Sequence, residues 1–447
     1  MPKQLLVLAA LLVLRLGLAQ GLEPKPADPS LQPFEPVKAP QPAGHLLKHG
    51  DRLAICGDSI TEQKMYSRLI EDYLTVCVPE LNISVRQYGW GGETAPGFLA
   101  RMTNDCLRFK PTIATMCYGM NDHEYRPYED RIGLKYRTNS AAIVEAFKSH
   151  GARVILGSPG CVGKVPSWRH NTNSTVTDLN LNLCQLRNID IDLAHKEGVR
   201  FADVFWPMLT GEVAAQKMYG TNYAIAGKDG VHPGWAGHLV MAYAFLKAMG
   251  LKGDIGTFVA DVNKSKLVAS KGHEVLSARD GVFQIRSSRY PFCACAPPNV
   301  PDGSYPACST DDPQRDTSIQ SGMTLVPFNA DLNRLTLVVR NAREKNYKVT
   351  WGDASRTYTA DQLARGINLA GEFEENPFSA AFAHVDAAVA AKQSFETRQI
   401  KQAFRSEQAK ADMEAVVAQT EKEREPLVEA IKAAVVPVTH TLKIEPE

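Results

Sequence analysis

The chain has 447 residues, of which 44% are hydrophobic and 22% are charged, and its formal net charge is +1 at pH 7. This composition is typical of a globular protein that is long enough for two or three domains. The near-zero net charge gives no indication of a nucleic acid or an anionic membrane surface as a partner.

The first residues have the pattern of an export signal. Lys3 precedes a short apolar run, and Gly17 and Ala19 are small residues at the spacing that a signal peptidase needs. The run is too short to span a bilayer, and no later run is long and apolar enough to be a transmembrane span. We therefore expect a signal peptide over 1–19, cleavage after Ala19, and a secreted or periplasmic protein.

The segment 45–255, which follows a proline-rich linker over 20–44, alternates apolar runs with helical patterns. The expected strands cover 53–56, 83–88, 113–118, 154–157 and 201–204. The expected helices cover 62–76, 95–109, 132–150, 176–197 and 236–249. Such alternation predicts a parallel sheet with helices on both faces. We expect an α/β fold of the flavodoxin-like type, a three-layer α/β/α sandwich around a five-stranded parallel sheet.

A serine lies where the first of these strands passes into the first helix. Gly57 and Asp58 predict a turn after the strand, and Ser59 follows at the amino end of the helical pattern. Open α/β sheets place their chemistry at the carboxyl ends of strands, and the N–H groups of a helix N-terminus favour negative charge. Ser59 is therefore a candidate nucleophile, although an N-cap serine is the plain structural alternative.

Three further loops follow strands of the same sheet. Gly92 belongs to a pair of glycines that can expose a backbone N–H, and Asn121 can offer a side-chain amide as a donor. Ordinary turn and capping roles are the alternatives for both. Asp229 precedes His232 by three residues, so its carboxylate can bond one imidazole nitrogen while the other nitrogen faces the serine.

In order, these four blocks resemble the SGNH hydrolases, also called the GDSL esterase family, over roughly residues 50–250. The resemblance implies that Ser59 is the nucleophile, His232 the base and Asp229 its orienting carboxylate. It implies an oxyanion hole made of the Ser59 N–H, the Gly92 N–H and the Asn121 side-chain amide. No metal or organic cofactor is implied. The chain departs from the family at Tyr88, where an Asn often precedes the glycine loop.

Aromatic and acidic residues near these loops are candidates for the surroundings of the site. Aromatic side chains stack on sugar rings and pack on acyl chains, so a substrate pocket could include Trp90, Tyr118, His123 and Tyr125. Core packing is the alternative for each of them. The acidic neighbours Asp58 and Asp122 are expected to brace turns.

The rest of the chain has a different pattern. Over 256–370, short strand patterns separated by turn-rich stretches predict an accessory β-rich module. Over 371–447, two charged helical segments at 379–410 and 413–434 predict a helical hairpin. The final alternating segment, 438–444, is expected to return to the β-rich module as a strand.

Nine cysteines leave at least one thiol unpaired or in an intermolecular bond. Cys56 and Cys117 fall in expected strands and should be buried. The turn-rich stretch of the β-rich module contains Cys293, Cys295 and Cys308, and an oxidising compartment would allow a disulfide there.

The residues and the resemblance together indicate an exported serine esterase that hydrolyses O-acyl esters, most simply O-acetyl esters, on a carbohydrate. The substrate is then an acylated glycan or a small ester. A lipid esterase or lysophospholipase is the alternative within the same chemistry. A glycan-binding protein with little turnover on the same fold is the alternative outside it. The sequence leaves the acyl group, the sugar and the oligomeric state open.

Overall fold

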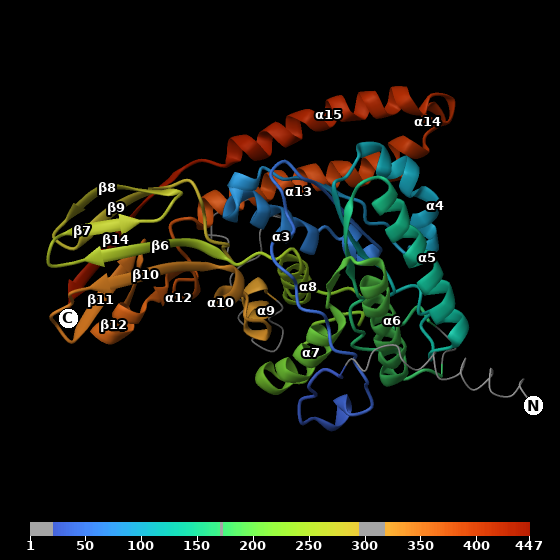
Figure 1. Cartoon of the computed structure of the whole chain (residues 1–447), viewed down its shortest axis with the longest axis horizontal. Coiled ribbons are helices and arrows are strands. Elements are labelled where there is room, and N and C mark those ends of the chain that lie inside the picture. Colours follow the sequence, from blue (N-terminus) through green and yellow to red (C-terminus); the bar gives the residue numbers. More distant parts are fainter. Residues whose placement is uncertain (1–20, 170–172, 295–317) are drawn as a thin grey trace, which may run out of the picture.

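A computed structural model describes residues 21–169, 173–294 and 318–447 of the chain (Figure 1). The expected signal peptide over 1–19 lies outside the described residues. So do Cys295 and Cys308 of the expected disulfide. In Figure 1 the parallel sheet and its helices form one part of the molecule, two further sheets form another, and the C-terminal helices run along both.

A five-stranded parallel sheet organises the first part, as the sequence predicted. Its strand order is β2-β1-β3-β4-β5, and all four neighbouring pairs are parallel. The strands are β1 (Arg52–Gly57), β2 (Ser84–Gln87), β3 (Ile113–Cys117), β4 (Arg153–Gly157) and β5 (Arg200–Ala202). Strands β1 and β3 are buried over nearly their whole length, because both of their faces are covered.

Helices cover both faces of this sheet. The helices are α2 (Ser59–Glu62), α3 (Tyr66–Asp72), α4 (Ala95–Asp105), α5 (Asp130–Ser149), α6 (Val176–Glu197), α7 (Phe205–Tyr219) and α8 (Trp235–Ala248). Successive residues of β1 point to opposite sides: Ile55 joins the core that contains α3 and α8, whereas Ala54 and Cys56 join the core that contains α4 and α5. This arrangement is the predicted three-layer sandwich.

One helix prediction in the α/β part differs from the structure. The helix expected over 62–76 is broken, because α2 ends at Glu62 and Lys64 has a φ of 57°, in the left-handed region. The chain resumes as α3 and then a π-helical turn, η2 (Tyr73–Cys77).

The second part contains two sheets that pack on each other. One has the order β13-β10-β6-β7, with β6 (Asp254–Asp261), β7 (Lys266–Ala269), β10 (Arg334–Arg340) and β13 (Ile367–Asn368). The other has the order β12-β11-β14-β9-β8, with β8 (His273–Arg279), β9 (Val282–Ser287), β11 (Asn346–Trp351), β12 (Ala354–Thr359) and β14 (Val438–Pro446). The rings of Phe258 and His440, one from each sheet, lie 6.0 Å apart in the shared core.

Strand β14 confirms that the end of the chain returns to the β-rich module. It pairs antiparallel with β9 on one side and β11 on the other, so the last residues form the middle of that sheet. Strands β8 and β12 were not predicted, because few of their side chains are buried: one in each strand.

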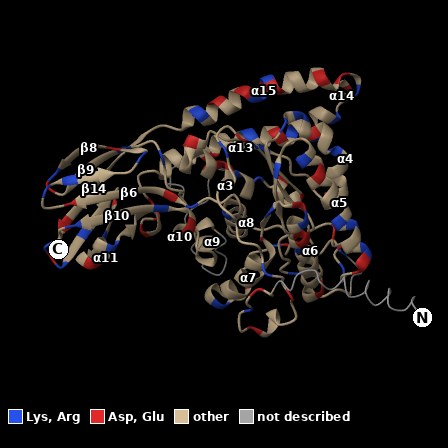
Figure 2. Cartoon of the chain, in the orientation of Figure 1, with Lys and Arg blue, Asp and Glu red and all other residues tan. Residues whose placement is uncertain are grey.

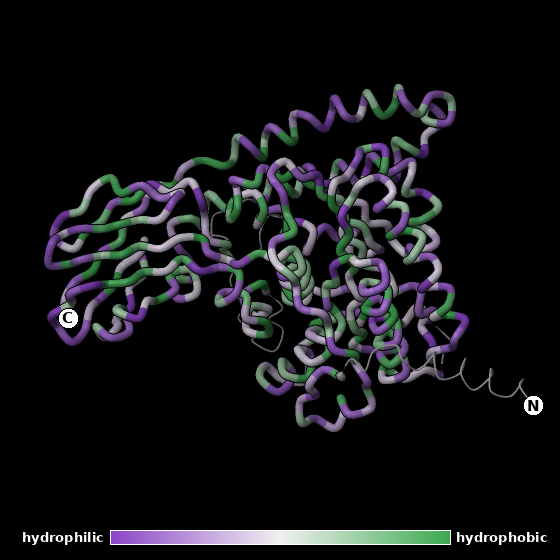
Figure 3. Tube along the Cα trace, in the orientation of Figure 1, coloured by the Kyte–Doolittle hydropathy of each residue, from purple (hydrophilic) through white to green (hydrophobic). Residues whose placement is uncertain are grey.

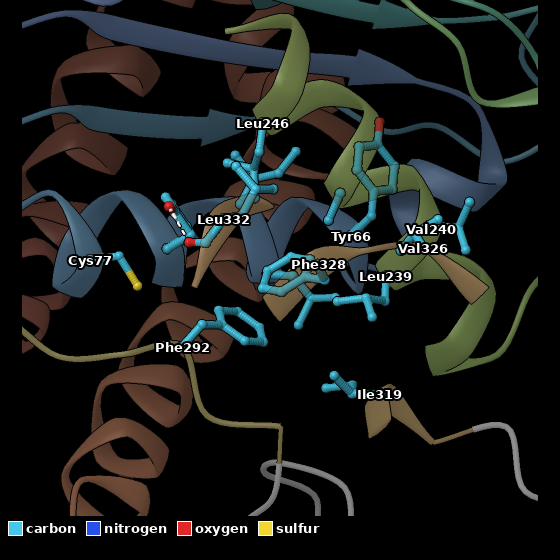
Figure 4. Close-up of a cluster of buried hydrophobic side chains, with 14 of the residues drawn as sticks. Tyr66, Cys77, Leu239, Val240, Leu246, Phe292, Ile319, Val326, Phe328 and Leu332 are labelled. Carbon is cyan, nitrogen blue, oxygen red and sulfur yellow. Dashed lines mark hydrogen bonds between the residues drawn. The ribbon is translucent and has the colours of Figure 1, made fainter. Parts of the chain in front are cut away.

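Buried aromatic and aliphatic side chains join the two parts. Figure 4 shows Phe292, Phe328 and Leu332 beside α3 and α8. Phe328 and Leu332 belong to α10 (Phe328–Leu332), which follows α9 (Ile319–Leu325). The Tyr73 hydroxyl also donates to the Leu332 carbonyl at 2.7 Å. The β-rich module is thus attached to the α/β part through a common core.

The C-terminal helices form the predicted hairpin. Helix α13 (Ser379–Lys401) packs on α3 and beside β2, and α15 (Met413–Ala434) packs back on α13 after the short α14 (Glu407–Ala411). Figure 2 shows charged residues along α15, and Figure 3 shows hydrophilic and hydrophobic residues alternating along the same helix. Only Thr420 and Ile431 of α15 are buried, so this helix makes a narrow contact with the rest of the chain, whereas α13 is buried at positions along its length.

Buried ion pairs hold α13 against α3. Arg68 donates two hydrogen bonds to the carboxylate of Asp386, at 2.5 and 2.9 Å. The ammonium of Lys392 lies 2.9 Å from Glu71 and 3.0 Å from Glu396. Each of these buried charges needs its partner to offset the cost of leaving water, so the ion pairs fix the position of α13 on α3.

Cys56 and Cys117 are buried, as predicted, and Cys293 is a buried free thiol. None of the helices in the described part of the chain combines the length and apolar character needed to cross a bilayer.

Candidate active site

A tight turn between β1 and α2 presents Ser59. A side chain at Gly57 would place its Cβ 2.0 Å from Thr61 Oγ1 and 2.9 Å from the Cys117 carbonyl, so only glycine fits there. Asp58 caps α2 by accepting the Ile60 N–H at 2.9 Å, and burial raises the pKa of this carboxyl to about 7. The capping role belongs to Asp58, which leaves the hydroxyl of Ser59 available.

The structure brings Ser59, His232 and Asp229 together. The distance from Ser59 Oγ to His232 Nε2 is 2.7 Å, and the distance from His232 Nδ1 to Asp229 Oδ2 is also 2.7 Å. The other oxygen of Asp229 accepts the N–H groups of Val231 and His232, both at 2.9 Å. Burial opposes ionisation of Asp229, but these hydrogen bonds outweigh it and lower the pKa of the carboxyl.

A second loop anchors the Asp229–His232 turn. The Gly163 N–H, in the loop after β4, donates to the Gly230 carbonyl at 2.9 Å. Gly230 has a φ of +81°, and a Cβ there would lie 2.6 Å from the Lys164 backbone nitrogen. The close packing of these two loops positions the imidazole above Ser59.

The three expected oxyanion donors differ in their hydrogen bonding. Among the described residues, the N–H groups of Ser59 and Gly92 have no protein acceptor. Gly92 has a φ of +73°, where a glycine is favoured. Asn121 donates one amide hydrogen to the Glu93 carbonyl at 3.0 Å, which leaves its second amide hydrogen for a ligand beside the Gly92 loop.

The four candidate pocket residues are in different environments. Tyr118 is buried, and its hydroxyl donates to Glu93 Oε2 at 3.0 Å. His123 is fully buried, and burial lowers its pKa to about 4. Tyr125 is 5% exposed, and its hydroxyl donates to Asn121 Oδ1 at 3.2 Å. The half-buried ring of Trp90 lies 5.0 Å from the guanidinium of Arg101.

The acidic neighbours brace the loops. Asp122 accepts the Ala95 N–H and the Gly119 N–H, both at 3.0 Å, and thereby ties the Asn121 loop to the start of α4. Burial raises the pKa of Asp122 to about 6. This is the bracing role expected for Asp58 and Asp122.

Sequence reasoning missed one aromatic residue at the site. Trp168, in the loop after β4, is 44% exposed, and its ring lies 6.0 Å from that of His232 and 6.3 Å from that of Tyr125. The Arg169 guanidinium lies 4.8 Å from the centre of the Tyr125 ring. The position of Trp168 after a strand of the same sheet was the available signal, but its loop carries no recognisable motif.

Three comparisons place this arrangement among known proteins. The model of the GDSL-like lipase/acylhydrolase family matches residues 55–240. An acetylxylan esterase of Geobacillus stearothermophilus is 23% identical over 223 residues, which is 45% of this chain and 95% of that protein.

Among solved structures, a gut microbial diltiazem-metabolizing enzyme is similar with a TM-score of 0.70 and 22% identity, over 91% of this chain and all of that one. This likeness shows that the fold of nearly the whole chain, including the parts beyond the α/β sandwich, has a known counterpart. An acetylxylan esterase from Geobacillus stearothermophilus aligns over 46% of this chain and 97% of its own, with 21% identity and a TM-score of 0.37. Residues 55–240 therefore match the GDSL-like lipase/acylhydrolase family of the SGNH hydrolases, and this match supports a serine esterase that acts on ester bonds.

Proposed function

We propose that this esterase is exported and removes O-acyl groups, most simply acetyl groups, from a carbohydrate through Ser59, His232 and Asp229. The observation that carries the proposal is the continuous chain of contacts from Ser59 Oγ through the imidazole to the Asp229 carboxylate, each 2.7 Å long. A serine hydroxyl is a weak nucleophile without such a base.

The first half of the reaction acylates the serine. Ser59 Oγ attacks the ester carbonyl carbon while His232 Nε2 takes the hydroxyl proton. The carbonyl oxygen becomes an oxyanion that accepts hydrogen bonds from the Ser59 N–H, the Gly92 N–H and the Asn121 amide. The intermediate collapses, the bond to the alcohol oxygen breaks, and His232 returns the proton to that oxygen. The sugar hydroxyl leaves, and the acyl group remains on Ser59.

The second half restores the enzyme. His232 takes a proton from water, whose oxygen attacks the acyl carbon, and the same donors bind the second oxyanion. The bond between the acyl carbon and Ser59 Oγ then breaks, His232 returns the proton to Ser59 Oγ, and the carboxylic acid is released. Asp229 bonds Nδ1 throughout and stabilises the imidazolium formed in each half.

The aromatic side chains beside the triad favour a sugar as the alcohol. Trp168 offers a half-exposed flat ring next to His232, and aromatic rings stack well on the apolar faces of sugars. The relative from Geobacillus stearothermophilus is an acetylxylan esterase, which agrees with an acetyl group on a glycan. Export is supported by the amino-terminal pattern ending at Ala19.

Acetate release from a panel of acetylated polysaccharides and acetylated sugars tests the proposal, with Ser59→Ala as the blank. The wild type should release acetate and the blank should not. Trp168→Ala should raise KM on acetylated oligosaccharides more than on p-nitrophenyl acetate, whereas Trp168→Phe should retain most of the affinity. Octanoyl esters turned over much faster than every acetylated sugar would contradict the carbohydrate assignment and support the lipid esterase.

A further inference from the structure

The carboxylate of Glu62 links the loop that carries Gly92 to the C-terminal hairpin. Glu62, the last residue of α2, accepts the Gly91 N–H with one oxygen. Its other oxygen accepts a hydrogen bond from Lys401, the last residue of α13, at 2.5 Å. The nucleophile's helix, the proposed oxyanion loop and the hairpin therefore meet at one ion pair, although Glu62 and Lys401 are 339 residues apart.

The backbone of this loop lies directly against α2. A Cβ on Gly89 would lie 2.2 Å from the Glu62 backbone nitrogen, and a Cβ on Gly91 would lie 2.9 Å from Glu62 Oε2. The Trp90 N–H donates to the Gly57 carbonyl at 3.1 Å. The loop is thus packed between the turn that carries Ser59 and the carboxylate of Glu62.

The hairpin also holds the side chain of Trp90, which lies in the middle of the loop. The Lys401 ammonium is 5.1 Å from the centre of the indole ring, and the Arg405 guanidinium is 5.2 Å from it. Arg405 is itself fixed by two hydrogen bonds to Asp105, at 2.8 and 2.6 Å. Cations above an indole face attract it, so this contact adds a second restraint on the loop from the same hairpin.

The charge of Glu62 gives Lys401 a further effect on the reaction. The carboxylate lies one peptide away from Gly92, where the transition state would place a negative charge. An unpaired anion there would oppose the oxyanion, whereas the ammonium of Lys401 offsets it.

We propose that Lys401 and Glu62 are positioning residues for the oxyanion loop, so that the end of α13 completes the esterase site. The proposal rests on the proposed role of Gly92 at that site. Neither residue touches the substrate: Glu62 holds the Gly91 peptide, and Lys401 holds Glu62 and balances its charge. The C-terminal hairpin is then a part of the catalytic unit.

The test uses the full chain and p-nitrophenyl acetate, a small ester that needs no sugar contacts. Lys401→Met should lower kcat roughly 10- to 100-fold with KM little changed, since small misplacements of catalytic groups cost rates of this order. Lys401→Arg keeps the charge and should recover most of the rate. Glu62→Gln should be milder than Lys401→Met, because the amide oxygen still accepts the Gly91 N–H.

The double variant separates this effect from a loss of fold. Glu62→Gln combined with Lys401→Met removes both charges and should be faster than Lys401→Met alone. Lys432→Met is the matched control, since Lys432 lies on α15 in an exposed pair with Glu429, and its rate should equal the wild type's. Melting temperatures of all variants show whether a lower rate is accompanied by a loss of folding stability.

Two outcomes would overturn the inference. One is a Lys401→Met enzyme with wild-type kcat, and the other is a double variant no faster than Lys401→Met. Both leave the proposed function intact, because its tests are the loss of turnover in Ser59→Ala and the preference for acetylated sugars, and neither depends on Lys401.

Discussion

Replacing Asp229 by Asn should nearly abolish turnover while leaving the fold and substrate binding in place. In the structure, Oδ1 of Asp229 accepts the N–H groups of Val231 and His232, and Oδ2 faces His232 Nδ1. The oxygen of an Asn side chain will keep the two backbone N–H groups, because only it can accept. Its NH₂ group must then face Nδ1 and donate to it.

This reversal forces the imidazole into the wrong tautomer. With Nδ1 as the acceptor, the proton of the neutral ring lies on Nε2, which can no longer take the proton of Ser59. Loss of the correct tautomer in Ser-His-Asp enzymes costs about 10⁴-fold in kcat, which is about 5.4 kcal/mol at 1.36 kcal/mol per factor of ten. We expect a loss of about 10³- to 10⁴-fold here.

The measurement is kcat and KM for p-nitrophenyl acetate at neutral pH, with KM expected to stay near the wild-type value. Asp192→Asn is the matched control, because Asp192 is an exposed partner of Arg137 on the surface. A loss smaller than tenfold in Asp229→Asn would refute the assignment of the orienting role to this carboxylate.

Two predictions concern stability. Asp386→Ala removes the partner of the buried Arg68 and should lower the free energy of unfolding, measured by urea titration, by about 3 kcal/mol. This value is at the lower end for a broken buried ion pair, because the Asp72 carboxyl lies near Arg68. An unchanged urea midpoint would contradict the role of the pair in docking α13. Burial lowers the pKa of His440 to about 3, so this residue's contribution to stability is present above pH 6.5 and lost as the pH falls toward 3. The difference in unfolding free energy between wild type and His440→Gln should therefore shrink over that range, and a constant difference would show that the residue does not titrate with unfolding.

Much of the α/β part could be predicted because its strands are buried on both faces. Strand β3 lies at 113–117 against the expected 113–118, and α6 covers the predicted 176–197, where a capping box at Thr175 marks its start. The broken helix after Ser59 was not visible, since its interruption depends on the backbone conformation of Lys64.

The site divides in the same way. Ser59 directly follows β1, so topology alone places it at the carboxyl edge of the sheet, whereas the Asp229–His232 pair lies in the loop between α7 and α8. The contact between Ser59 and His232, which are 173 residues apart, depends on tertiary packing. No sequence motif marks Trp168 or Lys401, because the position of Trp168 depends on the conformation of its loop and that of Lys401 on the docking of the hairpin. Composition and periodicity predict where a helix such as α13 forms, but tertiary packing determines which residue its last side chain contacts.

The most direct test of the account is to trap the acyl-enzyme equivalent with a fluorophosphonate probe and to locate the label by mass spectrometry. The account predicts one modified peptide carrying the probe on Ser59, no labelling of Ser59→Ala, and strongly slowed labelling of His232→Ala. A label on any other residue, or an unlabelled wild type that still hydrolyses p-nitrophenyl acetate, would contradict it.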